Sequence, residues 1–145
     1  VITVACSYLA SAEKNRVLPY GIHNGNRIAA HTASNGKIIL AYMQDQELDT
    51  WLEHYPLTRS TKYTVTDSDT FKQQLHDIRD QGWCLAVEEH EVSFIGFSVP
   101  IFDGSGRVVA GLNTVARSEQ YTVEQVTNRC LVPMQELAKQ LRMLL

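Results

Sequence analysis

The sequence predicts a single α+β domain in which helices flank an antiparallel sheet of about five or six strands. The chain has 145 residues, of which 44% are hydrophobic and 20% charged, so it can bury one core but is short for two ordinary domains. Apolar residues at period two alternate along the chain with apolar stripes at helical spacing. Two apolar runs, residues 94–102 and 107–115, flank a Gly-rich turn and predict a hairpin.

The N-terminal third alternates between strand and helix signals. Residues 1–9 carry apolar side chains at every second position and predict a strand. Residues 17–22 predict another strand, which ends in the Asn-Gly turn of residues 23–26. A helix is expected to begin near Ser34, and a second helix is expected to be capped by Asp45 and stopped by Pro56.

The middle of the chain is expected to be looped before regular structure returns. Residues 57–69 are rich in Thr and Ser, and Ser68 or Asp69 then caps a helix that ends at Gly82. Residues 83–87 predict a short strand. Residues 88–93 predict an acidic connection whose charges are solvated.

The C-terminal segment predicts one long amphipathic helix. Thr122 and Gln125 have the spacing of a capping box, and apolar residues from Val126 to Leu144 follow on one helical face. Pro133 removes a backbone donor within this stripe, which predicts either a kink or a later helix start.

Composition restricts the partners and the compartment. A formal net charge of -3 repels a polyanion, so this segment is not expected to bind DNA by itself. Cys6, Cys84 and Cys130 form no CxxC pair, so neither a disulfide scaffold nor structural zinc is expected, and a reducing cytoplasm fits. No apolar run approaches the roughly twenty residues of a membrane span. Because the chain starts inside an apolar strand without Met, we expect it to be part of a longer protein.

The start of the helix near Ser34 is the first candidate site. Residues 32–37 are small and polar, so a ligand could approach their backbone closely. The first amides of a helix have no intrahelical acceptor, and the helix dipole favours an anion beside them. Ser34, Asn35 and Gly36 are therefore expected to bind a carboxylate. The alternative is an ordinary capped helix start.

The predicted hairpin is the second candidate site. A four-residue turn would place three pairs of residues on one sheet face, namely Ser98 opposite Gly111, Gly96 opposite Asn113 and Phe94 opposite Val115. The glycines leave volume beside two hydrogen-bonding side chains, which predicts an unfilled hollow for a small molecule. Alternatively, the glycines permit close helix packing or mark bulges.

Signals for catalysis or metal binding are weak. Cys84 and His90 could form a thiol and base pair, but a cysteine in a strand is more often a small core residue. The histidines show no HxxxH spacing. We therefore expect no enzyme activity, no metal and no cofactor. An enzyme with Cys84 as its reactive thiol is the alternative.

Several segments resemble one known family in the right order along the chain. The matching segments are residues 27–41, which contain the family's Gly-Lys helix start, the Thr-rich residues 59–66, the Ile-Arg-x-x-Gly end of a helix at 78–82, Glu88-Glu89, and residues 99–103 and 106–112. The chain thus resembles the effector-binding domain of IclR-type transcriptional regulators over nearly its whole length. The resemblance implies a GAF-like fold and an upstream winged helix-turn-helix domain, absent from this segment, that binds operator DNA.

The resemblance also implies a pocket. The positions that bind small keto acids in the family correspond in this sequence to Ser34, Asn35, Ala86, Gly96, Asn113 and Val115. Ala86, Gly96 and Val115 replace polar residues of that pattern, which implies a larger and less polar site that suits a ring. Trp83 and the Leu112-Asn113 pair look most like the branch that senses aromatic acids such as 4-hydroxybenzoate and protocatechuate, or their catabolites.

The resemblance implies a regulator, either repressor or activator, that forms a homodimer or homotetramer. A small organic acid would shift it between arrangements by binding one of them more tightly. Ser98 and Gly111 would line the pocket with the residues above. A pure oligomerisation module, in which the last helix pairs between subunits, is the third interpretation.

Overall fold

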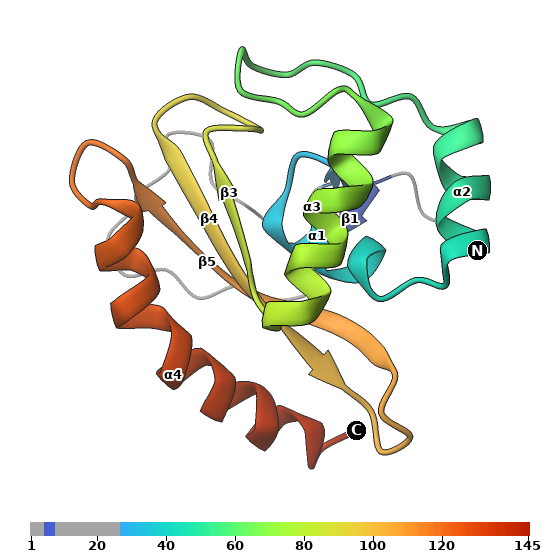
Figure 1. The fold of residues 1–145 in the computed structure, drawn as a ribbon. Helices are drawn as coiled ribbons and strands as arrows, with labels where there is room; N and C mark the ends of the chain where they lie inside the picture. Colours follow the sequence, from blue (N-terminus) through green and yellow to red (C-terminus); the bar gives the residue numbers. More distant parts are fainter. Residues whose placement is uncertain (1–4, 8–26) are drawn as a thin grey trace.

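The computed structural model describes residues 5–7 and 27–145 (Figure 1). Its centre is an antiparallel sheet in the order β3-β4-β5, formed by β3 (Cys84–Val87), β4 (Phe94–Phe102) and β5 (Val108–Arg117). A separate antiparallel pair consists of β1 (Ala5–Ser7) and β2 (Arg27–Ala29). The predicted α+β class is confirmed, with the described strands divided between two sheets instead of joined in one.

The strand predictions differ in how far they can be compared with the structure. β3 and β4 lie where the sequence predicts them, and β1 lies within the predicted strand of residues 1–9. The predicted strand of residues 17–22 lies outside the described residues. The sequence does not predict β2, because three residues are too short to display an alternating pattern.

The helices in the described part of the chain are α1 (Ser34–Ala41), α2 (Asp45–His54), α3 (Ser68–Gln81) and α4 (Val123–Arg142). The predicted start of α1 is confirmed. The cap of α2 lies one residue earlier than predicted, at Gln44, and the cap of α3 lies at Asp67, before both predicted positions, Ser68 and Asp69. Asp67 takes this place because its carboxylate accepts a hydrogen bond from the Thr70 amide at 2.8 Å.

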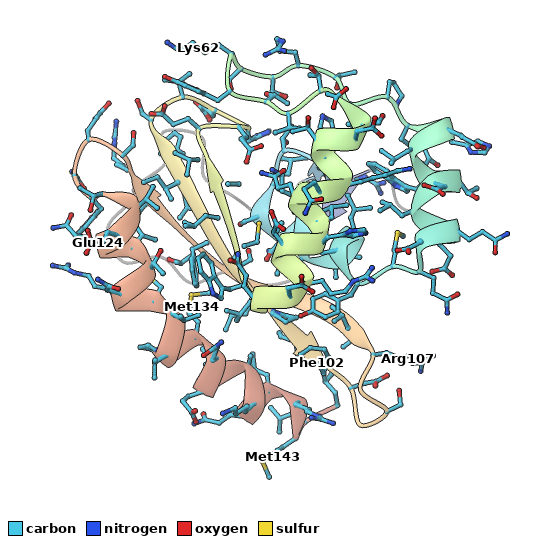
Figure 2. All side chains as sticks on the ribbon, viewed as in Figure 1. Lys62, Phe102, Arg107, Glu124, Met134 and Met143 are labelled. Atoms are coloured by element: carbon cyan, nitrogen blue, oxygen red, sulfur yellow. The ribbon has the colours of Figure 1, made fainter. Side chains whose placement is uncertain are left out.

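The start of α4 follows the predicted capping box. The Gln125 amide donates to the Thr122 hydroxyl at 3.2 Å, and the Thr122 amide donates to the Gln125 side chain at 2.9 Å. The later start that Pro133 suggested is therefore wrong, because Pro133 lies inside the helix. Met134 of α4 packs toward the sheet, whereas Met143 beyond its end points away from the domain (Figure 2).

The helices cover the central sheet from both sides (Figure 1). α4 covers one face, where Val126 and Ala138 pack against Ile95, Phe97 and Val99 of β4. α1 and α3 cover the other face, and α2 joins them in a second core. The members of that core include Ile38, Leu48, Trp51, Phe71, Leu75 and Cys84. The predicted placement of helices on the sheet faces is confirmed.

The register of the hairpin differs from the predicted one by two residues. Ser98 pairs with Asn113 and Gly96 with Val115, instead of Gly111 and Asn113. One residue of the shift comes from the turn, because the Asp103 amide donates to the Arg107 carbonyl at 2.8 Å and Gly106 adopts a φ of 83°. The other comes from a bulge beside Phe102, which adds one residue to β5.

The two shifts together preserve the predicted face, because side chains alternate with a period of two. We call this face the glycine face, and its members are Phe94, Gly96, Ser98, Gly111, Asn113, Val115 and Arg117. The opposite face carries Ile95, Phe97 and Leu112 against α4. The glycine face is therefore the one that α1 contacts.

A buried ion pair fixes α1. Lys37 is fully buried, and its ammonium donates to both Glu89 oxygens at 2.6 and 2.7 Å and to Gln74 Oε1 at 2.8 Å. An ammonium group has three protons, so each one has an acceptor. The Phe71 ring lies 5.9 Å from the ammonium nitrogen. The expectation that the charges of residues 88–93 are solvated is therefore wrong for Glu89, because a cation distant in sequence compensates its charge.

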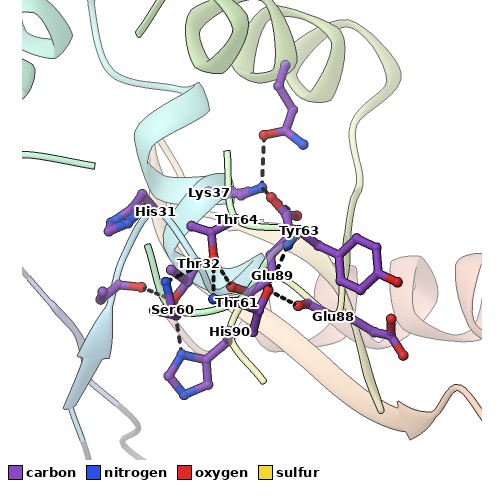
Figure 3. A network of polar contacts seen from close by, with 12 residues as sticks. His31, Thr32, Lys37, Ser60, Thr61, Tyr63, Thr64, Glu88, Glu89 and His90 are labelled. Carbon is purple, nitrogen blue, oxygen red and sulfur yellow. Dashed lines mark hydrogen bonds and ion pairs between the residues drawn. The ribbon is translucent and has the colours of Figure 1, made fainter. Parts of the chain in front are cut away.

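The Thr-rich loop of residues 57–67 holds the other side of Glu89 (Figure 3). The Thr64 hydroxyl donates to the Glu89 carbonyl at 2.7 Å and accepts the amides of Ser60 and Thr61. The Thr61 hydroxyl donates to the Glu88 carbonyl. The Thr-rich loop thus holds the backbone of Glu88 and Glu89, while Lys37 of α1 holds the Glu89 carboxylate.

Replacing Lys37 should expose the cost of leaving Glu89 without its cation. We expect Lys37→Met to lower the free energy of unfolding by about 3–5 kcal/mol, because a buried carboxylate loses its compensating charge. Urea denaturation followed by circular dichroism measures this. Lys72→Met breaks the exposed pair with Asp49, whose side chains are 38% and 55% exposed, and should cost less than about 1 kcal/mol. Equal losses in the two variants would contradict this account.

Candidate functional site

The first turn of α1 is buried without a capping acceptor. Its N-cap residue, Ala33, offers no side-chain hydrogen bond, and its first turn contains no acidic residue. The other described helices all have an acidic residue in the first turn, namely Asp45 and Glu47 in α2, Asp69 in α3 and Glu124 in α4. The positive end of the α1 dipole thus lies inside the protein with no acid of its own helix beside it.

The amides of this turn are available as donors. The first helical hydrogen bond runs from the Lys37 amide to the Ala33 carbonyl at 2.9 Å. Within the described part of the chain, the amides of Ser34, Asn35 and Gly36 have no recorded acceptor. Ser34 and Asn35 are 3% and 8% exposed, so little bulk water reaches this end of the helix. An anion is the partner that such a group of amides favours.

The first turn of α1 lies directly on the glycine face. A Cβ atom at Gly96 would be 2.8 Å from Ser34 Oγ, and one at Gly111 would be 2.6 Å from Asn35 Oδ1. The predicted hollow above these glycines is therefore wrong, because Ser34 and Asn35 fill it. The alternative interpretation, close helix packing, describes both glycines. A ligand at this turn must lie at the end of the helix and not beneath it.

Ser98 supports this turn from below. It is fully buried, and its hydroxyl lies 2.7 Å from Ser34 Oγ and 2.8 Å from Asn35 Oδ1. A hydroxyl has one proton and an amide oxygen only accepts, so Ser98 donates to Asn35 and receives the proton of Ser34. The Asn35 amide nitrogen keeps its two protons for other acceptors. Ser98 therefore orients Ser34 and Asn35, and reaches a ligand only through them.

The remaining predicted site residues lie around the same turn. Ala86 of β3 pairs with Gly96, Asn113 pairs with Ser98, and Val115 pairs with Gly96 on its other side. Gly36 is held against the backbone, since a Cβ there would be 2.2 Å from the Ala30 carbonyl oxygen. The structure thus brings together all the predicted site residues, which are Ser34, Asn35, Gly36, Ala86, Gly96, Ser98, Gly111, Asn113 and Val115.

Sequence reasoning missed Arg117. It lies on the glycine face opposite Phe94, two residues beyond Val115. The alternation of side chains would have found it had the predicted strand continued beyond residue 115. It also missed the partnership of Lys37 and Glu89, because no local pattern links residues that are distant in sequence.

Thr32 and His90 lie beside the entry to α1 (Figure 3). The Thr32 hydroxyl donates to the Ala29 carbonyl at 2.9 Å, so the contact at 3.1 Å to His90 Nδ1 has the imidazole as donor. Partial burial lowers the pKa of His90, with the nearby Glu91 carboxylate opposing the shift. The ring is therefore neutral at physiological pH and brings no charge to this region.

Cys84 has the properties of a core residue. It is fully buried, and burial raises the pKa of its thiol to about 12. A thiolate is the reactive form, and its fraction near neutral pH is negligible with such a pKa. This environment opposes the alternative in which Cys84 acts as a nucleophile with His90.

Comparison with known proteins identifies the family. Residues 5–143 match the family described as bacterial transcriptional regulator IclR C-terminal. The chain belongs to the IclR family. The predicted effector-binding domain of an IclR-type regulator is thus confirmed.

Within the described ranges, no helix is long and apolar enough to cross a membrane.

Two curated relatives come from Acinetobacter baylyi. The chain is 45% identical over 144 residues to the Pca operon regulatory protein, covering 99% of this chain and 51% of that protein. It is 37% identical over 142 residues to the p-hydroxybenzoate hydroxylase transcriptional activator, covering 98% and 52%. The chain therefore spans about half the length of these relatives. Both are named as regulators of transcription, which supports the prediction that this domain is not an enzyme.

Solved structures give the same result for the fold. A double mutant of the PobR inducer-binding domain from Acinetobacter, in complex with 3-hydroxybenzoic acid, superposes with a TM-score of 0.86 at 36% identity, covering 91% of this chain and 75% of that one. A transcriptional regulator from Rhodococcus sp. RHA1 superposes with a TM-score of 0.93 at 27% identity, covering 99% and 58%.

The backbone contact at Gly36 gives the first prediction for this region. Helix propensity alone would favour Gly36→Ala by about 1 kcal/mol. We expect instead a loss of about 3 kcal/mol in the free energy of unfolding, because the new Cβ overlaps the Ala30 backbone. Gly104→Ala, where a Cβ meets nothing within 4 Å, should change stability by less than about 0.5 kcal/mol. Urea denaturation of both variants measures this, and a stabilised Gly36→Ala would contradict the packing.

The second prediction concerns Cys84. Iodoacetamide near neutral pH should leave Cys84 unmodified in the folded chain and label it only after denaturation, because the thiol is buried and protonated. Cys130, which is only partly buried, should be labelled earlier. Mass spectrometry of tryptic peptides distinguishes the two positions. Rapid labelling of Cys84 in the folded chain would revive the hypothesis of a reactive thiol.

Proposed function

We propose that this chain is a single effector-binding domain that senses a small organic acid, with the ligand's carboxylate held at the N-terminus of α1. The observation that carries the proposal is the buried first turn of α1, which has neither a capping side chain nor an acidic residue. Such a turn lacks the anion that a buried helix end favours, and a ligand can supply it.

The binding groups follow from the geometry. The amides of Ser34, Asn35 and Gly36 and the Asn35 side-chain amide would donate to the carboxylate oxygens. Hydrogen bonds to a charged group contribute about 1.5–3 kcal/mol each, more than neutral ones. Ser98 would hold Ser34 and Asn35 in place, and Gly96 and Gly111 allow the turn to approach the sheet.

Two observations support the proposed ligand class: the compounds named for the relatives, and the side chains that lie beside Gly96. One relative is named for p-hydroxybenzoate hydroxylase, and the PobR domain binds 3-hydroxybenzoic acid. Ala86 and Val115 are apolar and lie beside Gly96 on the same sheet face. They could contact a ring, while Asn113 offers a hydrogen bond to a substituent. The effector would then be an aromatic carboxylate or one of its catabolites.

The regulatory mechanism is proposed as linkage. An upstream winged helix-turn-helix domain would contact operator DNA, which accords with the net charge of -3 on this segment. The protein would act in the cytoplasm as a homodimer or homotetramer. An effector that binds one arrangement of subunits more tightly shifts the population toward it, and so represses or activates transcription.

A second function is favoured by the surface of α4. Val132 and Leu137 are 64% and 45% exposed, and Met143 follows them toward the end of the chain. These side chains could pair between copies of the chain, as the oligomerisation hypothesis requires. A thermal-shift panel of organic acids separates the two functions, because an effector domain is stabilised by its ligand and a pure oligomerisation module is not.

The variant Asn35→Asp tests the proposed carboxylate site. Its new carboxylate would accept the first-turn amides and satisfy the helix dipole, so the free energy of unfolding should be retained. It would also repel the carboxylate of p-hydroxybenzoate and weaken its binding by at least about tenfold. Isothermal titration calorimetry measures the affinity. Asn128→Asp makes the same charge change on the exposed side of α4 and should bind like the parent chain. Unaltered affinity in Asn35→Asp would place the acid elsewhere.

A further inference from the structure

The direction of α1 along the sheet determines what its N-terminus faces. Ser34 contacts the position of Gly96, and Asn35 contacts that of Gly111, which pairs with Pro100. At the other end of the helix, the Tyr42 ring packs edge-on against Phe102 with centroids 5.6 Å apart. α1 therefore runs alongside β4 in the same direction. Its N-terminal amides point back toward the start of β4 and the end of β5.

Phe94 and Arg117 form the pair at that end of the glycine face. The guanidinium carbon of Arg117 lies 5.7 Å from the Phe94 ring centre, a cation–π contact between the two residues of this pair. Its recorded polar partner is Glu119, whose Oε2 lies 3.4 Å from Nη2 and whose side chain is 61% exposed. The Arg117 side chain is itself 34% exposed, so this long contact does not restrict the donors that solvent reaches.

The Nε–H group of Arg117 is buried and has no acceptor within the described part of the chain. Arginine stays protonated at every physiological pH, so this group cannot relieve its burial by losing a proton. Buried donors are almost always paired in folded proteins, and an unpaired one indicates a missing partner. The partner that fits a guanidinium is a carboxylate or another oxygen acceptor.

The spacing of residues along β5 limits the ligand. Val115 lies beside Gly96, beneath Ser34, and Arg117 is two residues further along the same strand. Two residues of an extended strand span about 7 Å. This is comparable with the separation of substituents at opposite ends of a benzene ring. A ligand anchored at α1 would pass over Val115 and bring its far end to Arg117.

We propose that Arg117 is a specificity-determining residue that binds a second oxygen-bearing group of the effector, opposite the carboxylate held at α1. The effector class is then an aromatic acid with a hydroxyl or carboxyl group at the far end of the ring. This inference rests on the proposed function, because it takes the carboxylate site at α1 as its starting point. It adds a residue and a second anchoring point that the carboxylate site alone does not require.

The test compares three acids that differ only in the far substituent: benzoate, 4-hydroxybenzoate and benzene-1,4-dicarboxylate. Their affinities are measured by calorimetry on the parent chain and on Arg117→Gln. We expect the parent chain to prefer the two substituted acids. Arg117→Gln should weaken these two by about 10- to 100-fold and benzoate by less than about threefold, because only the charge-assisted bonds to the far group are lost.

The matched control is Arg129→Gln. Arg129 also places its guanidinium over an aromatic ring, 5.4 Å from the centre of Tyr121, but it belongs to α4 and not to the glycine face. This variant should leave all three affinities unchanged. It separates the loss of a specific donor from the loss of a positive charge or of a cation–π contact.

Each other outcome contradicts the proposed role of Arg117 in binding the second group of the effector. Equal weakening of all three acids in Arg117→Gln would assign it a structural role, and no weakening of any would remove it from the site. If benzoate binding is lost in Asn35→Asp while Arg117→Gln retains every affinity, the proposed function stands and this inference fails. If none of the acids binds the parent chain, both fail together.

Discussion

The contact between the first turn of α1 and the glycine face is the constraint on which the rest of the site depends. The amides of a buried helix end need acceptors, and here the sheet supplies none: its Ser98 hydroxyl contacts the Ser34 and Asn35 side chains instead. Gly96 and Gly111 allow this approach because any larger residue would displace those side chains. The small side chains that let the turn pack this closely are uncharged, so the helix end also has no acid of its own, and on the proposed function a ligand supplies it.

The positive groups around α1 differ in whether the protein itself compensates them. Lys37 belongs to the same helix, but its three protons are bound by Glu89 and Gln74, so its charge is compensated within the protein. A free lysine there would bind any anion strongly and with little regard for shape. On our proposals, recognition depends on backbone amides, which have fixed directions, and on the guanidinium that lies over Phe94. Directional donors of this kind discriminate between ligands by geometry.

Local patterns in the sequence predicted much of this fold. Alternation identified the two faces of the hairpin, and capping residues located helix starts to within two residues, because both signals arise between neighbours in the chain. The hollow above Gly96 and Gly111 could not be judged in this way, since its content comes from Ser34 and Asn35, more than sixty residues away. Glu89 was placed in solvent for the same reason: nothing near it in sequence shows Lys37. The predicted site residues lie near one another as expected, whereas the manner of their packing required the structure.

The hairpin between β4 and β5 shows how a register shift of two residues preserves the set of side chains that face α1. Relative to a four-residue turn without a bulge, the three-residue turn and the bulge beside Phe102 each displace β5 by one position. The two displacements together leave every side chain of β5 on the same side of the sheet. A single residue inserted into the paired part of β5, with no compensating bulge, would invert the strand beyond it. Asn113 would then face α4 and Leu112 would face α1, and the surface that we propose to face the ligand would be lost even though every residue of it was still encoded.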